Sequence, residues 1–273
     1  MVRPIHLTIV PLQGASNPKP GRRNFACMIE FLYRLYWGTE HLIAPGLRYS
    51  QDSYEAALSK LVNSGTVWLD IGCGHQVLPE WRIDAERELV SRASYVAGID
   101  IDPTSIAKHR TITNTWVGSV ECLPFPDNSF NLITANMVVE HLAAPCRVFA
   151  EIQRTLVPGG IFLCHTPNVN SYIIAINRCL PNVFKTIAAK LLEGRAPEDV
   201  YPTYYHCNSD RTIVETAAVS GLEVKQIRYI PSTATFARIL PMAALELLWI
   251  RATMRESLAC YRSNILGLLY KAS

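Results

Sequence analysis

Two hydrophobic patterns alternate along this chain. Short apolar runs rich in β-branched residues are bounded by glycine, proline or acidic residues. They predict buried strands at 66–71, 95–100, 115–118, 132–136, 161–165 and 222–230. Apolar residues that recur every three or four positions predict helices at 25–37, 51–63, 79–91, 145–157, 171–193 and 210–220. From residue 66 onward strands and helices follow one another in turn, which indicates an α/β fold with a parallel sheet and right-handed crossovers.

The residues T-V-W-L-D-I-G-C-G at 66–74 carry the clearest local signal. A buried strand runs into Asp70 and then into Gly72 and Gly74. Glycine allows positive φ and places no Cβ in front of a ligand, so neighbouring amides could point into a cavity. A dinucleotide-binding turn is the competing interpretation, but it needs a third glycine where this chain has Val77.

A second acid stands at the end of the next predicted strand, 95–100. At the carboxyl end of a parallel strand, the Asp100 carboxylate could accept hydrogen bonds from a ribose diol. Asp102 is followed by Pro103, the usual pair at a helix entry, so we predict that Asp102 is an N-cap.

Composition sets the broad class. With 273 residues, 49% hydrophobic and 18% charged, the chain suits one α/β domain with additions. The balance of 26 Lys and Arg against 23 Asp and Glu argues against nucleic acid as the main partner. The N-terminal apolar run is too short for a signal peptide, and no run of apolar residues is long enough to predict a spanning helix. We expect a cytoplasmic protein, soluble or peripheral to a membrane, with a flexible lead-in at 14–24.

Eight cysteines are scattered through the chain without a C-x-x-C pair, at positions 27, 73, 122, 146, 164, 179, 207 and 260. They predict small buried side chains in a reducing compartment, and neither disulfides nor a zinc site. Glu140 has no second or third carboxylate at a suitable spacing, so we predict no metal.

Three motifs together resemble the class I S-adenosylmethionine (SAM) methyltransferases. The run D-I-G-C-G is similar to their first motif, and V-V-E-H-L at 138–142 to a turn they share. The most specific match is G-S-V-E-C-L-P-F-P-D-N-S-F-N at 118–131, which resembles the G-D-A-E-x-L-P-F-x-D-x-S-F-D run of the group that includes the quinone-biosynthesis methyltransferases. The resemblance covers about 51–230 and a final strand at 265–270. Gln76 and Ser119 depart from the family pattern.

This resemblance implies a doubly wound, seven-stranded, mostly parallel sheet closed by an antiparallel last strand, with helical lid additions. Residues 1–48 would form an N-terminal extension and helical lid. Residues 49–273 would form the methyltransferase domain, with helical insertions at about 171–206 and 232–262. The implied cofactor is SAM, with binding residues Asp70, Gly72, Cys73, Gly74, Asp100, Ile101, Ser119, Val120 and Asn136.

The turn after the fourth strand offers the best-placed general base, His141, since neutral imidazole can take a hydroxyl proton near pH 7. A histidine that only caps or orients the turn would look the same. Tyr205 and His206 are a second choice for acceptor contact or base, against a tyrosine cluster that packs the lid. The polar residues at 165–168 are expected to form a loop on the same rim.

The resemblance implies methyl transfer to a hydroxyl of a small amphipathic molecule, lipid or glycan precursor, because the lid segments are apolar and aromatic. C-methylation of a quinone-like precursor is the alternative. Two further hypotheses are a SAM-binding protein without catalysis and a nicotinamide-dependent oxidoreductase.

Two apolar segments each keep more than one interpretation. The aromatic helix at 25–37 either packs on the domain or covers an apolar substrate. The segment 236–261, with its arginines, is either a lipid-facing or homodimer surface or a second part of the lid.

Overall fold

The computed structural model describes residues 20–179, 201–237 and 239–272. From residue 50 onward helices and strands alternate, as the sequence predicts, except that no helix separates the third and fourth strands. The described helices are α1 (Pro20–Ile43), α2 (Ser50–Leu61), α3 (Ile83–Arg92), α4 (Pro103–Ile106), α5 (Pro145–Thr155), α6 (Tyr172–Cys179), α8 (Asp210–Ser220) and α9 (Leu240–Thr253), with the 3-10 turns η1 (Glu80–Arg82), η2 (Val139–His141) and η5 (Glu256–Tyr261).

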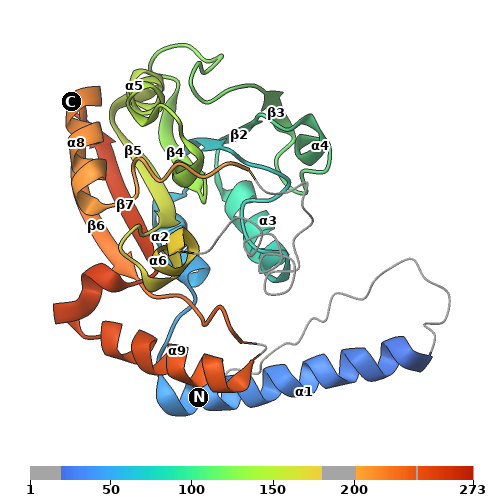
Figure 1. The fold of residues 1–273 in the computed structure, drawn as a ribbon. Coiled ribbons are helices and arrows are strands. Elements are labelled where there is room, and N and C mark those ends of the chain that lie inside the picture. Colours follow the sequence, from blue (N-terminus) through green and yellow to red (C-terminus); the bar gives the residue numbers. More distant parts are fainter. Residues whose placement is uncertain (1–19, 180–200, 238, 273) are drawn as a thin grey trace.

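Seven strands form one sheet in the order β3-β2-β1-β4-β5-β7-β6 (Figure 1). They are β1 (Val67–Ile71), β2 (Tyr95–Asp100), β3 (Asn114–Val117), β4 (Phe130–Asn136), β5 (Leu156–Pro167), β6 (Leu222–Ile230) and β7 (Asn264–Lys271). The first five are parallel, whereas β7 lies between β5 and β6 and is antiparallel to both. The predicted doubly wound fold with an antiparallel closing strand is therefore confirmed.

Helices cover both faces of the sheet because alternate strand residues point to opposite sides. Trp68 of β1 packs on one side with Tyr54 and Leu58 of α2. Its neighbour Leu69 packs on the other side with Phe149 of α5. All five side chains are fully buried, and each such burial stabilises the fold by about 1.5–3 kcal/mol.

Element boundaries match the predictions where the end signals are local. β2, α8 and β6 have the predicted limits, and Asp102 caps α4 by accepting hydrogen bonds from the Thr104 and Ser105 amides. The prediction for the aromatic helix is wrong at its end, since α1 continues through Gly38 to Ile43. α1 also begins within the predicted lead-in, whose remainder lies outside the described residues, as does the later part of the predicted helix at 171–193.

The fifth strand is much longer than predicted. The sequence predicts a helix through residue 157 and a strand only from residue 161, but β5 begins at Leu156 and includes Pro158, Gly159 and Gly160. The pairing with β4 shifts between Phe130 and Leu132, which lets the irregular segment stay in the sheet.

The expected loop at 165–168 is also wrong. Residues 165–167 belong to β5, and His165, Thr166 and Asn168 are fully buried. Their partners lie inside the protein: Thr166 donates to Glu140, and the Asn168 amide donates to the carbonyls of Cys260 and Arg262. These contacts fix the carboxyl end of β5 to the turn after β4 and to the segment before β7.

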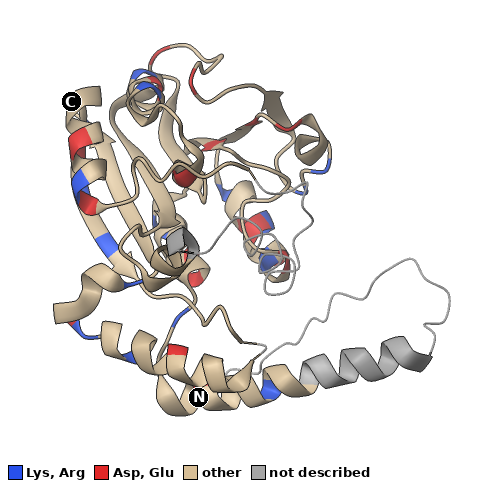
Figure 2. Ribbon diagram, viewed as in Figure 1, with Lys and Arg blue, Asp and Glu red and all other residues tan. Residues whose placement is uncertain are grey.

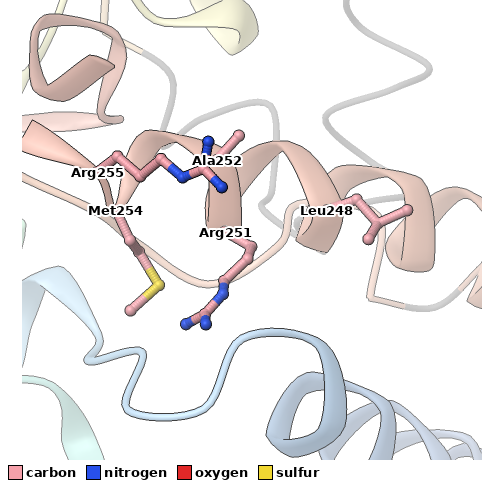
Figure 3. A pocket seen from close by; sticks show the side chains of 5 residues that line it. All are labelled: Leu248, Arg251, Ala252, Met254 and Arg255. Atoms are coloured by element: carbon pink, nitrogen blue, oxygen red, sulfur yellow. The ribbon is translucent and has the colours of Figure 1, made fainter. Parts of the chain in front are cut away.

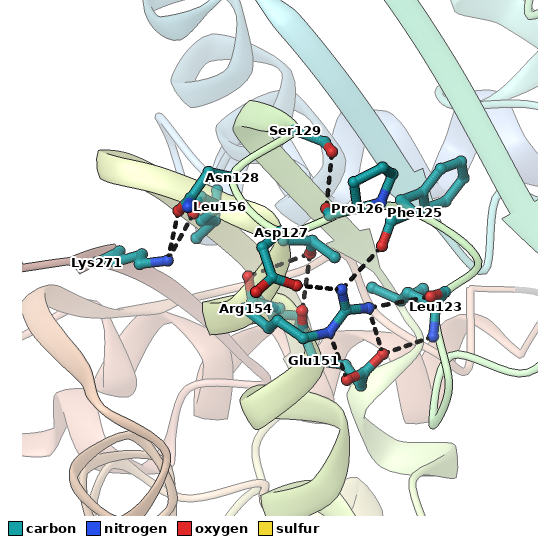
Figure 4. A network of polar contacts seen from close by, with 12 residues as sticks. Leu123, Phe125, Pro126, Asp127, Asn128, Ser129, Glu151, Arg154, Leu156 and Lys271 are labelled. Atoms are coloured by element: carbon teal, nitrogen blue, oxygen red, sulfur yellow. Dashed lines mark hydrogen bonds and ion pairs between the residues drawn. The ribbon is translucent and has the colours of Figure 1, made fainter.

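Arg154, near the end of α5, holds the loop at 123–127 in place (Figure 4). Its guanidinium donates to the carbonyl oxygens of Leu123 and Phe125, at 3.0 and 2.8 Å, and to the carboxylates of Asp127 and Glu151. This loop carries the L-P-F segment of the most specific sequence match. Its conformation is thus set by one partly exposed ion cluster and two backbone contacts.

α1 and α9 lie side by side, away from the sheet (Figure 1). Tyr36 of α1 is buried against Ala243 and Leu247 of α9, and its hydroxyl accepts from the Ala234 amide. The cavity described next has no described residue of α1 in its wall. A lid role for residues 1–48 stays a prediction.

Candidate functional site

A cavity of about 430 Å³ opens at the carboxyl ends of the parallel strands. This is the edge at which open α/β sheets bind ligands, and the volume lies in the usual range of small-molecule sites. Its wall combines the turns after β1, β2, β3 and β4 with a segment that precedes α8. The lining residues are Gly72, Gly74, Asp100, Ile101, Ser105, Gly118, Ser119, Val120, Glu121, Met137, Val138, His141, Leu142, Ala143, Tyr201, Pro202 and Tyr204.

The glycine turn after β1 approaches Val138 closely. Gly72 has φ +63°, and a Cβ there would lie 2.5 Å from Val138 Cγ2. Gly74 has φ +52°, but a Cβ there would meet open space, so Gly74 leaves room on the cavity side. The expectation that these amides point at a ligand is wrong in part, because the Gly72 and Cys73 amides both donate to the Ile99 carbonyl, at 2.7 and 3.2 Å.

Asp100, at the end of β2, lines the cavity and is fixed by two backbone amides. Gly74 donates to Oδ2 at 2.8 Å, and Asp102 donates to Oδ1 at 2.9 Å. A carboxylate has about four lone-pair positions, so each oxygen can still accept one more hydrogen bond. The geometry thus suits a ligand that offers two neighbouring hydroxyl groups.

His141 lies on the same wall, in the turn after β4. Its Nδ1 lies 2.8 Å from the Pro202 carbonyl oxygen, and its Nε2 lies 3.9 Å from Glu140 Oε1. A carbonyl oxygen only accepts, so Nδ1 carries the proton of a neutral ring and Nε2 holds the basic lone pair. Both Glu140, which is buried, and Pro202 restrict the orientation of this ring.

Part of this chain is similar to known proteins. Residues 69–164 match the family model described as a methyltransferase domain. The matched segment runs from the strand before the glycine turn to the middle of β5, so it contains both Asp100 and His141. Residues 69–164 of this chain are therefore a methyltransferase domain.

Curated relatives carry names that agree with this match. The chain is 30% identical over 132 residues to a protein of Mycolicibacterium smegmatis named as a SAM-dependent methyltransferase, which covers 45% of this chain and 49% of the relative. It is 30% identical over 105 residues to the demethylmenaquinone methyltransferase of Symbiobacterium thermophilum, covering 35% of this chain and 40% of the relative. The chain thus matches less than half the length of either relative.

Solved structures support the fold. A SAM-dependent methyltransferase from Mesorhizobium loti superimposes with a TM-score of 0.50 at 20% identity, covering 79% of this chain and 96% of that chain. A SAM-dependent methyltransferase from Methanosarcina mazei gives 0.50 at 16% identity, with 79% and 97% covered. The domain match favours the methyltransferase over the nicotinamide-dependent oxidoreductase.

SAM is the cofactor of this class of domain, and the cavity residues fit it. The Asp100 carboxylate can accept from a ribose diol, and Ile101, Val120 and Leu142 supply apolar wall for a flat base. Ser119 lines the cavity where the family has an acid, and its hydroxyl accepts from the Glu121 amide at 3.2 Å. It therefore keeps one donor for a ligand.

Three of the predicted cofactor residues lie behind the cavity wall. Asp70 is buried and accepts a hydrogen bond from Thr134, while the Cys73 thiol packs against Gly98. Burial raises the pKa of Asp70 to about 7, and the nearby carboxylates of Glu86 and Asp100 add to the rise, against the lowering by Thr134. Ligand contact by Asp70 and Cys73 stays a prediction.

Asn136 is the third, and it belongs to a polar network. Its amide nitrogen donates to Gln51 Oε1 at 3.0 Å and to the Val77 carbonyl at 3.2 Å. Its oxygen lies 2.8 Å from His165 Nδ1. Burial lowers the pKa of His165 to about 3, so this ring stays neutral and donates to Asn136. The network fixes α2 against β4 and β5 beneath the site.

Tyr205 and His206 do not line the cavity. Tyr205 has φ +54°, and the exposed His206 ring lies near Tyr204 and the Ala143 carbonyl, at 3.1 Å from Nδ1 to oxygen. Tyr201 and Tyr204 of the same aromatic group line the cavity instead. Spacing alone did not distinguish them, because the chain is irregular here. A catalytic role for Tyr205 or His206 is therefore only a prediction.

The cysteines are only partly as predicted. Cys73, Cys164 and Cys207 are buried, but Cys122 and Cys146 are exposed, as is Cys260. The expectation of buried side chains is wrong for those three, because they lie in turns or on outward helix positions. Cys27 and Cys179 are outside the residues whose side chains are described.

Proposed function

We propose that this chain transfers a methyl group from SAM to a hydroxyl group of a small amphipathic acceptor such as a lipid or glycan precursor. The observation that carries the proposal is the position of His141 on the wall of the cavity that Asp100 also lines. The hydrogen bond to Pro202 leaves Nε2 as the basic nitrogen. A base thus stands beside the proposed cofactor site.

SAM supplies a methyl group on a positively charged sulfur, already activated for displacement. The protein has to hold donor and acceptor in line and take one proton. His141 Nε2 would receive the hydroxyl proton while the acceptor oxygen forms its bond to the methyl carbon. Glu140 Oε1, 3.9 Å from Nε2, stabilises the positive charge that develops on the ring.

Apolar and aromatic groups form most of the cavity wall near His141, where the acceptor would bind. Met137, Val138, Leu142 and the rings of Tyr201 and Tyr204 all belong to the wall. Such a surface favours an acceptor with an apolar part, and the tyrosine hydroxyls can hydrogen-bond its polar end. A nucleic acid acceptor finds no matching basic groove here among the lining residues.

C-methylation of a quinone-like precursor is the second candidate. It is favoured by the relative from Symbiobacterium thermophilum, whose name gives demethylmenaquinone as its substrate. A base is useful in both reactions, because an activated ring carbon also loses a proton. The bond that carries the new methyl group distinguishes the two.

The test is incubation of the purified chain with SAM and a panel of amphipathic alcohols, phenols and quinols. We expect release of S-adenosylhomocysteine and a product whose methyl group NMR assigns to oxygen. A methyl group on ring carbon would favour the second candidate. Tight binding of S-adenosylhomocysteine without any product would indicate a SAM-binding protein without catalysis.

A further inference from the structure

The outward face of α9 is apolar although it meets solvent. Leu245 is 70% exposed and Leu248 55% exposed, and Met242 and Trp249 lie beside them at helical spacing. The opposite face, including Leu247, packs against α1. A surface helix normally turns polar residues outward, so an apolar outer face indicates a binding surface.

Two cations stand at the carboxyl end of this face. Arg251 and Arg255 are one turn apart and, with Leu248, Ala252 and Met254, line a hollow of about 520 Å³ (Figure 3). Within the described part of the chain, neither guanidinium has an ion pair or hydrogen bond. The ring centroids of Trp249 and Tyr261 lie 6.3 Å apart, so an aromatic pair borders this face.

The acid of α9 points the other way. Glu246 is 6% exposed and accepts hydrogen bonds from the Tyr172 hydroxyl and from the Thr235 and Phe236 amides. Figure 2 shows α9 without a second acidic position. The outer face of α9 is therefore apolar and positively charged, and Glu246 fixes the helix to α6 from behind.

We propose that the outer face of α9, extended by the turn that follows it and formed by Met242, Leu245, Leu248, Trp249, Arg251 and Arg255, docks on an anionic lipid bilayer. Leucine and methionine side chains suit the boundary of the acyl chains, tryptophan suits the headgroup level, and arginine pairs with lipid phosphate. This inference goes beyond the proposed methyl transfer and does not require it.

The arginines favour a bilayer over a second copy of the chain. In a twofold interface the same patch meets itself, so Arg251 and Arg255 would face their own copies. Glu256 follows Arg255 and is exposed, but its carboxylate already accepts a hydrogen bond from Arg262. Among the described residues, the six that form this face include no carboxylate to offset four positive charges, and like charges across an interface oppose association. An anionic membrane supplies the missing negative charge.

The test is co-sedimentation of the full chain with two kinds of vesicle, phosphatidylcholine alone and phosphatidylcholine mixed with phosphatidylglycerol. We expect binding to the mixed vesicles, at least about tenfold weaker partitioning to phosphatidylcholine, and weakening by salt. Leu245→Glu with Leu248→Glu, and separately Arg251→Glu with Arg255→Glu, should each reduce binding at least about tenfold.

Matched controls place the same changes elsewhere. Val214→Glu with Val219→Glu alters exposed apolar residues of α8, and Arg87→Glu with Arg211→Glu reverses exposed arginines of α3 and α8. Both controls should bind vesicles like the wild type. Affinity for S-adenosylhomocysteine verifies the fold of every variant, and the arginine pair still tests the proposal if the leucine pair fails to fold.

Three results would overturn the proposal. One is a wild-type chain that ignores the mixed vesicles, and another is an equal loss in the controls. The third is a dimer in analytical ultracentrifugation that the leucine variant dissociates, without vesicle binding, which would assign this face to a second copy. None of these results bears on methyl transfer, because the vesicle assay needs neither cofactor nor turnover.

Discussion

His141 Nδ1 lies 2.8 Å from the carbonyl oxygen of Pro202. This contact joins the turn after β4 to the segment that precedes α8, two parts of the chain 61 residues apart. Because the carbonyl can only accept, the contact selects one tautomer of the neutral ring. It thereby decides which nitrogen can serve as a base, and it holds the ring at the cavity wall.

Replacement of His141 tests this role. We expect His141→Gln to lower kcat by about 10²–10⁴, the usual contribution of a general base, with affinity for S-adenosylhomocysteine unchanged within about threefold. The rate is measured as S-adenosylhomocysteine release with an acceptor found in the panel. His206→Gln compares the second candidate base directly: because His206 is exposed and outside the cavity wall, we expect this variant to keep its rate. Full activity in His141→Gln would exclude His141 as the base.

The buried acid Asp70 makes stability depend on pH. Its pKa is about 7 in the folded protein, raised first by burial, and about 3.9 in an unfolded chain. Between these two pKa values the folded state keeps a proton that the unfolded state loses. The contribution of Asp70 to the unfolding free energy is therefore complete below about pH 3.9, and it is lost as pH rises to about 7.

Asp70→Asn removes that titration. Between about pH 5 and about pH 8 the wild type should lose roughly 2–3 kcal/mol more unfolding free energy than Asp70→Asn does. Urea unfolding at the two pH values measures the difference, and the exposed Asp84→Asn should behave like the wild type. Parallel losses in wild type and Asp70→Asn would show that Asp70 does not hold a proton in the folded protein.

The close approach of Gly72 to Val138 predicts unequal effects of two alanines. Gly72→Ala combines a left-handed φ with a contact of 2.5 Å and should cost about 2–5 kcal/mol. Gly74→Ala meets open space, so it should cost only about 1–2 kcal/mol from its φ. In urea unfolding, Val138→Ala should restore part of the loss in Gly72→Ala. Equal losses for both alanines would contradict this packing.

The sequence predicts those parts of the fold whose signals are local. Asp102 with Pro103 marks a helix start and Gly221 a helix end, so those boundaries are right to the residue. Pro158-Gly159-Gly160 carries an equally strong turn signal, yet the sheet absorbs it through a shift in pairing with β4. Tertiary pairing overrode local preference there.

The site could be predicted only in part. Asp100 and His141 follow motifs at strand ends, and the parallel sheet brings those ends together. The Pro202 carbonyl belongs to the backbone of an irregular segment. Its contact with His141 does not depend on the type of residue, so the sequence could not predict it. Likewise, the motif that contains Asp70 does not reveal that its side chain turns inward to Thr134. The packed structure decides that the Asp70 carboxylate is buried and that the Asp100 carboxylate lines the cavity.

The central claim is that the cavity edge at Asp100 binds the adenosyl group. Calorimetry with S-adenosylhomocysteine on wild type, Asp100→Ala and Asp102→Asn tests it most directly, since Asp102→Asn removes the same charge from a residue that caps α4. We predict that Asp100→Ala weakens binding by about 10–100-fold, the loss of a charged hydrogen-bond acceptor, while Asp102→Asn stays near wild type. Equal affinity of wild type and Asp100→Ala would contradict the assignment.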